Sequence, residues 1–484
     1  MSLAIWWIRR DLRLTDNTAL HAALSDHELI APVYILDPAL LKSGRNADGT
    51  HGPRIAWMLD GLRALDTDLR AIGSRLIVRH GQPRTELPAL AKQIGAAAVY
   101  FNRDYSPYAL KRDSEMHTLL EGVGIAAHDF KDLVVHEATE TLSQAGQPFS
   151  VYSPYRKAWN ALPKPSLYPA PQHLHTPETI DSMAIPTAAD FGMEAAAQPI
   201  TEASEAAARK NLAEFMAAPI YDYADNRNSP ALDGSSIMSP YLRWGMISPR
   251  TAFDAAQHAL STAPNKDACD GVDKWIGELV WREFYYQVLA RNPHVTRGAF
   301  RPMYDALQYE NGQDVPALLT AWQTGQTGYP IVDAAMRQMN ATGWMHNRCR
   351  MLTASFLCKD LLIDWKIGER YFMQRLLDGD LACNNGGWQW TAGVGTDAAP
   401  YFRVFNPATQ AVKFDPDGAY VRRWLPELRN VPNQYIHEPH TMPDDVQQAA
   451  GCIVGRDYPA PLVDHSVQRD RVLKLFDAVR AANP

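Results

Sequence analysis

The sequence lacks two features that mark membrane-bound and secreted proteins, namely long hydrophobic runs and paired cysteines. No run approaches the roughly 20 apolar residues that a membrane-spanning helix needs. The opening segment MSLAIWWIRRDLRL has a short apolar run followed by arginines, which is the reverse of a secretory signal and predicts a first buried strand. The five cysteines are odd in number and show no CxxC spacing: Cys269, Cys349, Cys358, Cys383 and Cys452. We therefore expect a cytoplasmic protein without disulfides, structural zinc or any other metal site.

The sequence also lacks a basic excess, an internal repeat and the glycine motif of dinucleotide-binding folds. Its formal net charge of −7 argues weakly against indiscriminate nucleic-acid binding, although it leaves room for a local basic groove. The loop after the first predicted strand reads RRDLRLTDN instead of GxGxxG, so a dinucleotide in the usual Rossmann position has no support. With 484 residues, 46% of them hydrophobic and 21% charged, the chain predicts a globular protein of two or more domains.

The first 130 residues alternate short β-rich runs with amphipathic stretches. Such alternation predicts an α/β domain, a doubly wound, Rossmann-like parallel sheet of five strands, over residues 1–130. The expected strands are Ala4–Ile8, Ile30–Leu36, Arg75–Val78, Ala97–Phe101 and Ile125–Phe130. The expected helices are Asn17–Leu24, Arg54–Ile72, Thr85–Ile94 and Pro107–Val123. Ligands of these sheets favour the carboxyl ends of the strands, where Asp37 and Asp104 would lie.

The rest of the chain predicts a connector and a second domain. From Pro163 to Thr201 the sequence is rich in Pro, Ala and Thr, a composition that blocks regular structure and indicates an interdomain connector, which we place at 131–201. From Glu202 the pattern is helical, with few strand signals and many aromatics. We expect a large all-α domain over 202–484 that ends on an amphipathic stretch, Ser466–Ala481, without a long tail.

The segment Asp378–Arg403, DGDLACNNGGWQWTAGVGTDAAPYFR, carries the strongest functional signal. A buried core has no need for two acids, an Asn pair, a Gly-Gly and two Trp in one stretch. Adjacent glycines let backbone approach a flat ligand closely, and a Trp side chain needs a polar partner and flat neighbours. The segment indicates a site for an aromatic cofactor and an aromatic substrate. Taken alone, Trp388 and Trp390 would be read as core residues.

Three further segments combine polar and aromatic residues. The serines of DGSSIMSP (233–240), near Tyr223, suit a pyrophosphate, although local grounds alone favour plain N-capping by serine. Trp275, Glu278, Trp281 and Arg282 share one broad helix face, which a half-exposed, salt-bridged helix would also show. In WMHNRCRM (344–351) polar groups lie among apolar ones, and a lone His346 is more often structural than catalytic.

Taken together, these motifs resemble the DNA photolyase/cryptochrome family over nearly the whole chain. RRDLRLTDN, PFSVYSPYRKAW, WREFYYQ, TGYPIVDAAMRQ, LLIDWKIGERYF and the block at 378–403 occur in the family's order and spacing. The chain is most similar to the class I cyclobutane pyrimidine dimer (CPD) photolyases. Asn347 stands where (6-4) photolyases typically have a second histidine, Trp390 where DASH-type cryptochromes usually have Tyr, and Asn384 where plant and animal cryptochromes usually have Asp or Cys.

The resemblance implies FAD as the cofactor, reduced in the active form. The implied FAD-binding residues are Tyr223, Ser235, Ser236, Ile237, Met238, Ser239, Trp275, Arg350, Asp378, Gly379, Asp380 and Asn384. Arg350 would pair with Asp378 beside the flavin, and a guanidinium there stabilises negative charge on the reduced ring. Electrons would reach the flavin through Trp388, Trp365 and Tyr309, which stands where the family's terminal Trp is expected. A second, antenna chromophore would lie near Asp37, Asp104 and Arg243, with 8-hydroxy-5-deazaflavin favoured over FMN or 5,10-methenyltetrahydrofolate.

The resemblance further implies a lyase that repairs pyrimidine dimers in single- or double-stranded UV-damaged DNA under blue light. Glu278 and Asn384 would act in the reaction. The implied substrate-binding residues are Glu278, Trp281, Arg282, Asn347, Arg348, Met351, Trp390, Arg403 and Gln410. The expected state is a monomer with no obligate protein partner and no membrane association. The alternatives are a cryptochrome-type photoreceptor, a (6-4) photoproduct photolyase and, from another class, a flavin-free DNA-binding scaffold.

Overall fold

The computed structural model describes residues 2–43, 52–191, 198–397 and 403–482. The N-terminal part is a sheet of five parallel strands in the order β3-β2-β1-β4-β5. Their bounds are β1 Leu3–Ile8, β2 Leu29–Leu36, β3 Ile77–His80, β4 Ala98–Asn102 and β5 Ala126–Phe130. The predicted doubly wound sheet is confirmed, with strand ends displaced by at most two residues. The strand order reverses between β1 and β4, so the loops after these two strands lie at the switch point of the sheet.

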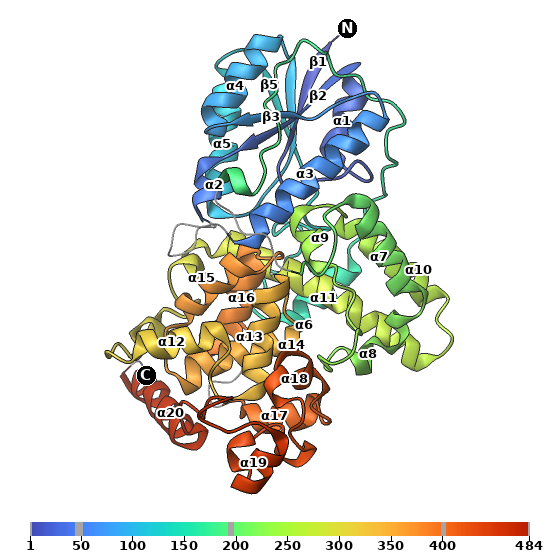
Figure 1. Cartoon of the computed structure of the whole chain (residues 1–484). Coiled ribbons are helices and arrows are strands. Elements are labelled where there is room, and N and C mark those ends of the chain that lie inside the picture. The colour runs from blue at the N-terminus through green and yellow to red at the C-terminus, as the bar shows by residue number, and fades with distance from the viewer. Residues whose placement is uncertain (1, 44–51, 192–197, 398–402, 483–484) are drawn as a thin grey trace.

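Helices cover both faces of this sheet (Figure 1). Side chains of α1 (Thr18–Asp26) and α3 (Pro53–Ala71) pack with Trp6 and Ile8 on one face. Side chains of α4 (Pro83–Ile94) and α5 (Pro107–Glu121) pack with Ile5 and Trp7 on the other. Strand β1 therefore contributes alternate residues to two cores, as the period of two dictates. A short α2 (Pro38–Ser43) follows β2.

The described part of the connector contains one α-helix, α6 (Tyr152–Ala161), which packs against the helical domain at α11 (Lys266–Arg291). Residues 163–188 form neither helix nor strand, as the proline-rich composition predicts. They run along the α/β domain, where the amide of Leu174 donates to Ile72 O and that of Met183 to Val78 O. A 3-10 turn, η1 (Ala189–Phe191), follows. The boundaries placed at 131 and 201 stay predictions.

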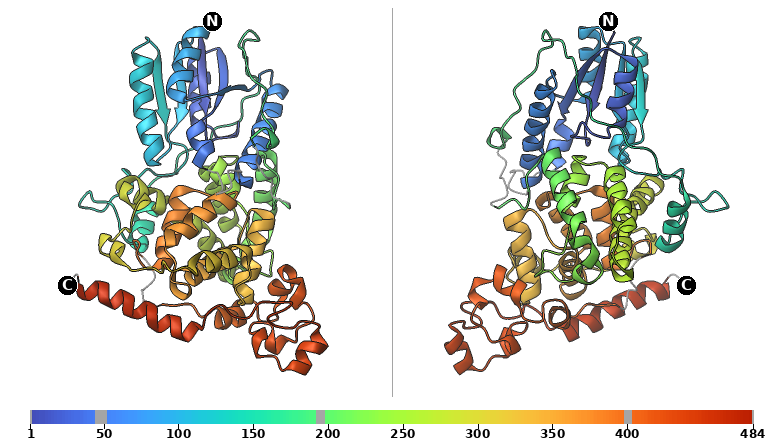
Figure 2. Two further views of the ribbon diagram at one scale, coloured as in Figure 1. Left: turned by 60° about the vertical axis from the view of Figure 1, so that its left-hand side comes forward. Right: turned by 90° about the vertical axis from the view of Figure 1, so that its right-hand side faces the viewer.

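The C-terminal part is helical. Besides α11 it contains α7 Glu205–Ala217, α8 Tyr223–Asn226, α9 Ser239–Trp244, α10 Pro249–Ser261, α12 Val315–Thr324, α13 Pro330–Thr342, α14 Asn347–Ser355, α15 Trp365–Arg375, α16 Leu381–Ala392, α17 Pro407–Phe414, α18 Ala419–Trp424, α19 Asp444–Ala450 and α20 His465–Ala482. A π-helical turn, η5 (Phe356–Asp360), extends α14, and short 3-10 turns complete the domain: η2 Pro219–Asp222, η3 Pro293–Thr296, η4 Pro302–Ala306, η6 Pro426–Leu428, η7 Asn433–Tyr435 and η8 Pro439–Thr441. Figure 2 shows the α/β domain seated on the helical one, with α20 along the far end.

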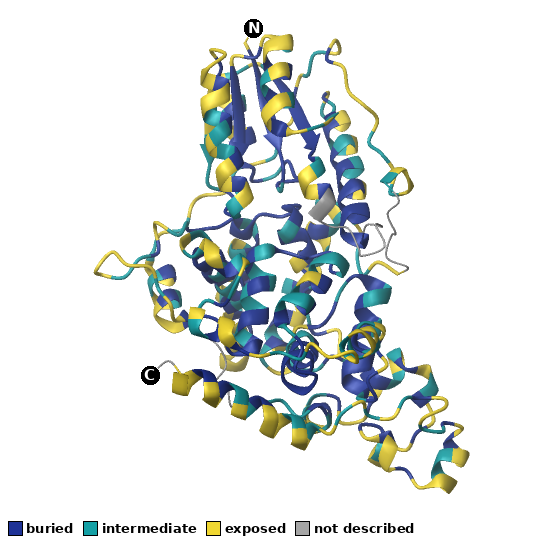
Figure 3. Cartoon of the chain, turned by 90° about the vertical axis from the view of Figure 1, so that its left-hand side faces the viewer, coloured by how far each residue is buried: buried dark blue, intermediate teal, exposed yellow. Residues whose placement is uncertain are grey.

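The buried core runs through both parts of the chain. Strands β1, β2 and β4 are buried almost throughout, whereas the edge strand β5 is partly exposed and α20 exposes much of its surface at the edge of the molecule (Figure 3). One hydrophobic cluster spans the two domains, because residues of α3 and of the loop after β1 pack with residues of α9 and α11. Within the described residues, no helix combines the length and apolar character that crossing a membrane requires.

Candidate flavin and dimer site

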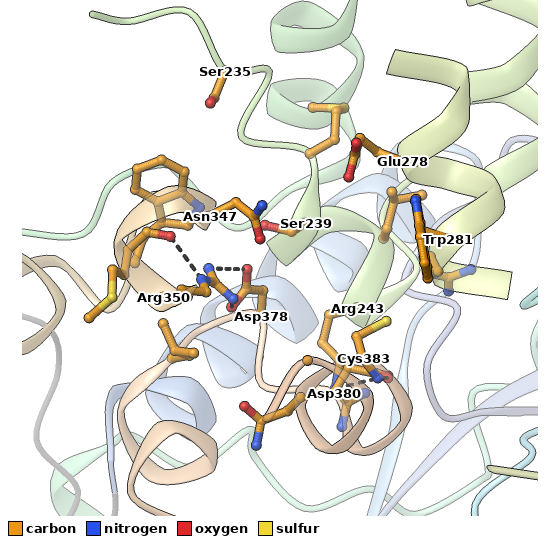
Figure 4. A pocket seen from close by; sticks show the side chains of 18 of the residues that line it. Ser235, Ser239, Arg243, Glu278, Trp281, Asn347, Arg350, Asp378, Asp380 and Cys383 are labelled. Carbon is orange, nitrogen blue, oxygen red and sulfur yellow. Dashed lines mark hydrogen bonds and ion pairs between the residues drawn. The ribbon is translucent and has the colours of Figure 1, made fainter. Parts of the chain in front are cut away.

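A cavity of about 520 Å³ opens among α9, α11, α14 and α16. This volume lies within the range of about 300–1,000 Å³ typical of small-molecule sites. Twenty of the residues predicted for the flavin, its electron supply or the substrate line it: Tyr223, Ser235, Ser236, Ile237, Met238, Ser239, Trp275, Glu278, Trp281, Arg282, Asn347, Arg348, Arg350, Met351, Asp378, Gly379, Asp380, Asn384, Trp388 and Trp390. Figure 4 shows Glu278 and Trp281 on one helix, across from Asn347, Arg350 and Asp378. The structure thus brings the residues predicted for cofactor and for substrate into one space.

The serine loop before α9 is held in a strained shape. Ile237 has φ of +50°, in the left-handed region that β-branched residues rarely enter. Asn211 Nδ2 donates to the Ser236 carbonyl at 2.8 Å, and Trp275 Nε1 donates to Ser236 Oγ at 3.0 Å. The Ser236 hydroxyl is therefore engaged by the protein, while Ser235 and Ser239 also line the cavity. Backbone strain of this kind persists where the surroundings enforce it, commonly in ligand-binding loops.

Glu278, on α11, is paired with a residue that the sequence did not single out. Arg227 Nη2 lies 2.7 Å from Glu278 Oε1. Burial raises the pKa of the Glu278 carboxyl above the usual value for glutamate, and the neighbouring Arg227 only partly opposes this. A carboxyl with a raised pKa can carry a proton and donate a hydrogen bond at higher pH than a free glutamate can. Glu278 is thus suited to act as a donor.

Trp281, one turn along α11, is stacked on Tyr152 of α6. The two ring centroids are 3.7 Å apart with an interplanar angle of 6°. Tyr152 is itself fixed, because its hydroxyl donates to Gly277 O at 2.8 Å and its amide to Asp397 Oδ2 at 3.0 Å. Tyr152 therefore holds one face of the Trp281 ring while the indole lines the cavity.

The α14 side of the cavity is built around an ion pair. Arg350 Nη2 lies 2.7 Å from Asp378 Oδ2 and Nη1 lies 3.2 Å from Oδ1, so the pair is bidentate and electrically balanced. His346 caps α14 by accepting from the Arg348 amide through Nδ1. Burial, followed by the cationic side chains of Arg348, Arg350 and Arg227, lowers the pKa of His346 to about 4. His346 is therefore neutral at pH 7 and structural in this arrangement.

Two features of α16 shape the opposite wall. Asp380 is its N-cap and accepts from the amides of Ala382 and Cys383 at 3.0 and 3.1 Å. Asn384 donates through Nδ2 to the Glu369 carbonyl at 2.9 Å, which leaves Oδ1 as its other polar atom. The Gly-Gly pair has two different roles. A Cβ at Gly386 would lie 2.1 Å from Tyr285 Cδ1, whereas a Cβ at Gly387 would meet no described heavy atom within 4 Å.

These residues fit a flavin dinucleotide. The open space beside Gly387 gives a flat ring system access to the helix backbone. The Nη1 atom of Arg243 is buried and has no hydrogen-bond partner among the described residues, as expected of a group that awaits a polar ligand. The loop at 235–239 and the Arg350–Asp378 pair would then hold the dinucleotide and the flavin respectively.

Several predicted residues lie outside the cavity lining. Arg403 is exposed and Gln410 partly exposed on α17. Trp365 is buried in the same hydrophobic cluster as Trp388, which does line the cavity, and Tyr309 packs against this cluster partly buried. Asp37 accepts from the Tyr108 hydroxyl, and Asp104 lies 3.3 Å from Arg10 Nη1.

Arg243, which the sequence assigns to the antenna site, lies in the wall of the large cavity, because α9 ends there and its Nε donates to Gly379 O at 2.7 Å. Its role toward an antenna chromophore stays a prediction. The roles of Asp37 and Asp104 toward a second chromophore stay predictions.

Sequence reasoning missed Arg227, Tyr152, Arg10 and Arg54 as site residues. Tyr152 lies inside the motif SVYSPYRKAW, so its position was a signal that could have been followed. Arg227 lies in an ordinary polar stretch, YADNRNSP, which gives no such signal. Arg10 and Arg54 reach the helical domain from the α/β domain, and only their tertiary contacts reveal them.

Two family models match the chain. The model described as DNA photolyase matches residues 4–175, and the model described as FAD binding domain of DNA photolyase matches residues 275–478. A deoxyribodipyrimidine photo-lyase of Synechococcus is 42% identical over 99% of this chain and 97% of its own length, and one of Halobacterium salinarum is 40% identical over 99% of both. The chain belongs to the DNA photolyase family.

Solved photolyase-family structures share the whole fold. A class III photolyase from Agrobacterium tumefaciens matches with a TM-score of 0.90 and 35% identity, over 99% of this chain and 98% of the other. A cryptochrome from Synechocystis matches at 0.89 and 30%, over 98% and 99%. An archaeal photolyase from Sulfolobus tokodaii, solved with two FAD molecules, matches at 0.81 and 30%, over 98% and 100%. The predicted family, fold class and enzyme class are confirmed, and the chain has a photolyase FAD-binding domain.

Proposed function

We propose that this photolyase repairs cyclobutane pyrimidine dimers in UV-damaged DNA under blue light. The observation that carries the proposal is the shared cavity, in which a fitting flavin site and the residues predicted for a dimer lie in one enclosure. Bound FAD, in its reduced form, would supply an electron to the dimer on excitation and take it back after the cyclobutane ring has opened. Every other part of the reaction falls to side chains of the chain itself.

Trp281 and Trp390 would form the walls that hold the dimer. Both indoles line the cavity, and flat aromatic rings stack on bases with little sequence preference. A dimer is poorly stacked in its duplex, so moving it into a cavity costs less than moving an undamaged base. Arg282, Asn347, Arg348 and Met351 would contact the dimer or its backbone in the cavity, and Arg403 and Gln410 would contact the DNA around it.

Glu278 would stabilise the negative charge that develops on the dimer. Its raised pKa extends the pH range in which the carboxyl is protonated, and a protonated carboxyl donates a hydrogen bond where a carboxylate would repel the charge. Arg227 now occupies one oxygen of Glu278 and would remain beside the dimer as a cation. Asn384 would contact the flavin on the α16 side.

Two finer proposals concern light and electron supply. Trp388, Trp365 and Tyr309 would carry electrons to the flavin, which is supported by their common hydrophobic cluster. A second chromophore would bind near Asp37 and Asp104, with 8-hydroxy-5-deazaflavin favoured and FMN or 5,10-methenyltetrahydrofolate as alternatives. The two FAD molecules of the Sulfolobus structure add a second FAD to these candidates. We also propose that the protein acts in the cytoplasm as a monomer.

The deciding experiment measures dimer loss from UV-irradiated oligothymidine, incubated with the reduced protein in blue light and in darkness. Recovery of thymine absorbance in the light alone is the expected result. No recovery with protein that holds reduced FAD would overturn CPD repair in favour of photoreception or, if a (6-4) substrate is repaired, of the other photolyase activity. A protein that binds no FAD at all would point to the flavin-free scaffold.

A binding experiment tests the aromatic walls separately. Trp281→Ala and Trp390→Ala should each weaken binding to dimer-containing DNA by about 1–3 kcal/mol. Trp57→Phe, in the α/β domain outside the cavity lining, is the matched control and should bind as the parent does. Unchanged affinity in both alanine variants would refute the assignment of the walls.

A further inference from the structure

Behind the cavity wall, an ion cluster joins the two domains. Arg10 follows β1 and Asp104 follows β4, so both lie at the switch point of the sheet and face the helical domain. Arg10 donates through Nη2 to Asp380 Oδ2 and, at 2.6 Å, to the Tyr286 hydroxyl, and its Nη1 lies 3.3 Å from Asp104 Oδ1. The Arg10 side chain is 14% exposed and that of Asp380 only 6%. A cation of the α/β domain is thus buried against the N-cap of α16.

The cluster holds more positive than negative charge. Arg54, at the start of α3, donates through Nη1 to Gly379 O at 3.0 Å, and Arg243 donates to the same oxygen at 2.7 Å. Arg10, Arg54 and Arg243 therefore share two carboxylates, those of Asp104 and Asp380. Burial, followed by the repulsion of Arg243 and Arg10, lowers the pKa of Arg54 to about 9. Arg282 also acts on Asp380, so positive charge is in excess here. This excess faces a low-dielectric interior, where a nearby anion would offset it.

Asp380 lines the cavity, and the protein engages both of its carboxylate oxygens. Asp380 therefore has no free oxygen with which to offset the remaining positive charge. Its Oδ1 accepts from the amides of Ala382 and Cys383, and its Oδ2 accepts from Arg10 and Tyr286. Burial alone would raise the pKa of Asp380, but Arg10, Arg243 and Tyr286 outweigh it and hold the pKa well below its usual range. Asp380 therefore stays ionised and fixed. By contrast, the Arg350–Asp378 pair across the cavity is balanced within itself.

The loop that carries Arg10 is clamped against the helical domain. Gly245, just after α9, has φ of +67°, and a Cβ there would lie 1.9 Å from Arg10 O. The Leu12 amide donates to Trp244 O at 3.1 Å, and Arg13 Nη1 donates to Gly245 O at 3.1 Å. Arg10 is thus a preorganised cation with little freedom to move away when the charge of the cavity changes.

We propose that the α/β domain sets the redox balance of the flavin site, with Arg10 as the positioning residue that supplies uncompensated positive charge behind Asp380 and Gly379. The inference rests on the proposed binding of FAD in the cavity. Oxidised FAD gains two electrons and one proton to form the anionic reduced flavin, and a buried positive charge nearby favours that product. The N-terminal domain thereby contributes to keeping the cofactor in the state that repair requires.

The test compares charge variants of the full-length, FAD-loaded protein. Arg10→Met removes the cation, Arg10→Lys keeps it, and Asp104→Asn removes a nearby anion while leaving Arg10 in place. Dithionite titration with a reference dye gives the two-electron midpoint potential. In Arg10→Met, reduced FAD should lose about tenfold in affinity relative to oxidised FAD, which is a fall of about 30 mV. Asp104→Asn should raise the midpoint potential. Arg10→Lys should change the potential by no more than about a third of the change in Arg10→Met.

The matched control is Glu205→Gln, which weakens interdomain contact away from the cavity. Glu205 accepts from the amides of Leu14 and Thr15 at 2.6 and 3.1 Å. If Arg10 acts only by holding the domains together, the midpoint potential should change in the same direction in Arg10→Met, Asp104→Asn and Glu205→Gln. That result would overturn the inference. Equal potentials in all variants would overturn it too. If Arg10→Met fails to fold, the sign of the Asp104→Asn shift decides. A parent protein that binds no FAD would contradict the proposed function as well as this inference. A parent that binds FAD but shows the wrong potential shifts in its variants would contradict the inference alone.

Discussion

At the scale of single residues, the stack between Tyr152 and Trp281 is the contact most open to measurement. The rings are parallel at 3.7 Å, and the Tyr152 hydroxyl donates to Gly277 O. Tyr152→Ala should weaken binding to dimer-containing DNA by about 0.5–1.5 kcal/mol, because Trp281 loses the ring that orients it. Tyr152→Phe keeps the ring and should bind within about 0.5 kcal/mol of the parent. Fluorescence anisotropy of a labelled dimer oligonucleotide measures both, and equal losses in the two variants would contradict the stacking role.

Glu278 gives a prediction about pH. Its pKa lies above the ordinary value of 4.5, so its protonated fraction falls as the pH rises through that raised pKa. If the protonated carboxyl is the donor, the rate of dimer repair under saturating light should fall over the same range. Glu278→Gln should flatten this profile and lower its maximum about three- to tenfold, or about 0.7–1.4 kcal/mol. Arg227→Leu removes a cation that lowers the pKa, so the fall should move to higher pH. A Glu278→Gln profile identical in shape to the parent's would exclude Glu278 as the titrating group.

At the scale of elements, the adjacent glycines of α16 provide a matched pair. Gly386→Ala would push a methyl group into the Tyr285 ring and should cost about 1–3 kcal/mol with or without FAD. Gly387→Ala meets open space and should stabilise the FAD-free protein by about 0.5–1 kcal/mol, through lower backbone freedom in the unfolded chain. The same methyl group should reduce FAD retention at least about tenfold, which is about 1.4 kcal/mol.

Thermal unfolding with and without FAD, together with the ratio of flavin to protein absorbance, measures the glycine pair. Full FAD retention by Gly387→Ala would mean that the flavin does not approach α16 at this residue. An unchanged melting temperature of Gly386→Ala would contradict the tight contact between α16 and α11.

At the scale of the whole molecule, a second buried ion network joins the domains. Arg250, at the start of α10, lies 3.0 Å from Asp16 Oδ2 and 2.7 Å from Asp132 Oδ1, and Arg13 lies 2.7 Å from Asp132 Oδ2. All four side chains are at most 4% exposed. Arg250→Met takes the cationic partner from the buried Asp16 carboxylate and leaves Asp132 paired with Arg13, and it should cost about 3–5 kcal/mol. Arg209→Ala removes an exposed contact to Thr15 and should cost less than about 1 kcal/mol.

Urea unfolding, followed by circular dichroism and by flavin fluorescence, tests the network. We expect the two signals to change together in the parent, because one hydrophobic cluster and this network unite the domains. A small loss in Arg250→Met, equal to that of Arg209→Ala, would show that the network adds little to domain docking.

The sequence by itself determined the elements and the family. The period of two in the first strands and the proline-rich composition of residues 163–188 act over a few residues, so local pattern was enough to place them. Element ends were less secure: the third strand was expected at Arg75–Val78 and lies at Ile77–His80, since pairing with β2 decides where it starts. The ordered motifs also named the residues of the cavity wall, because those residues lie within the motifs.

Only the tertiary structure decided which charges and rings meet. Arg10 and Asp380 are 370 positions apart, and Tyr152 and Gly277 are 125 apart. No local pattern links such pairs, since their contact depends on how the switch point of the sheet docks on α9 and α16. The same docking placed Arg243 in the cavity wall and paired Arg227 with Glu278. Charge balance in a buried site is a sum over segments that are distant in sequence, and the fold alone brings those segments together.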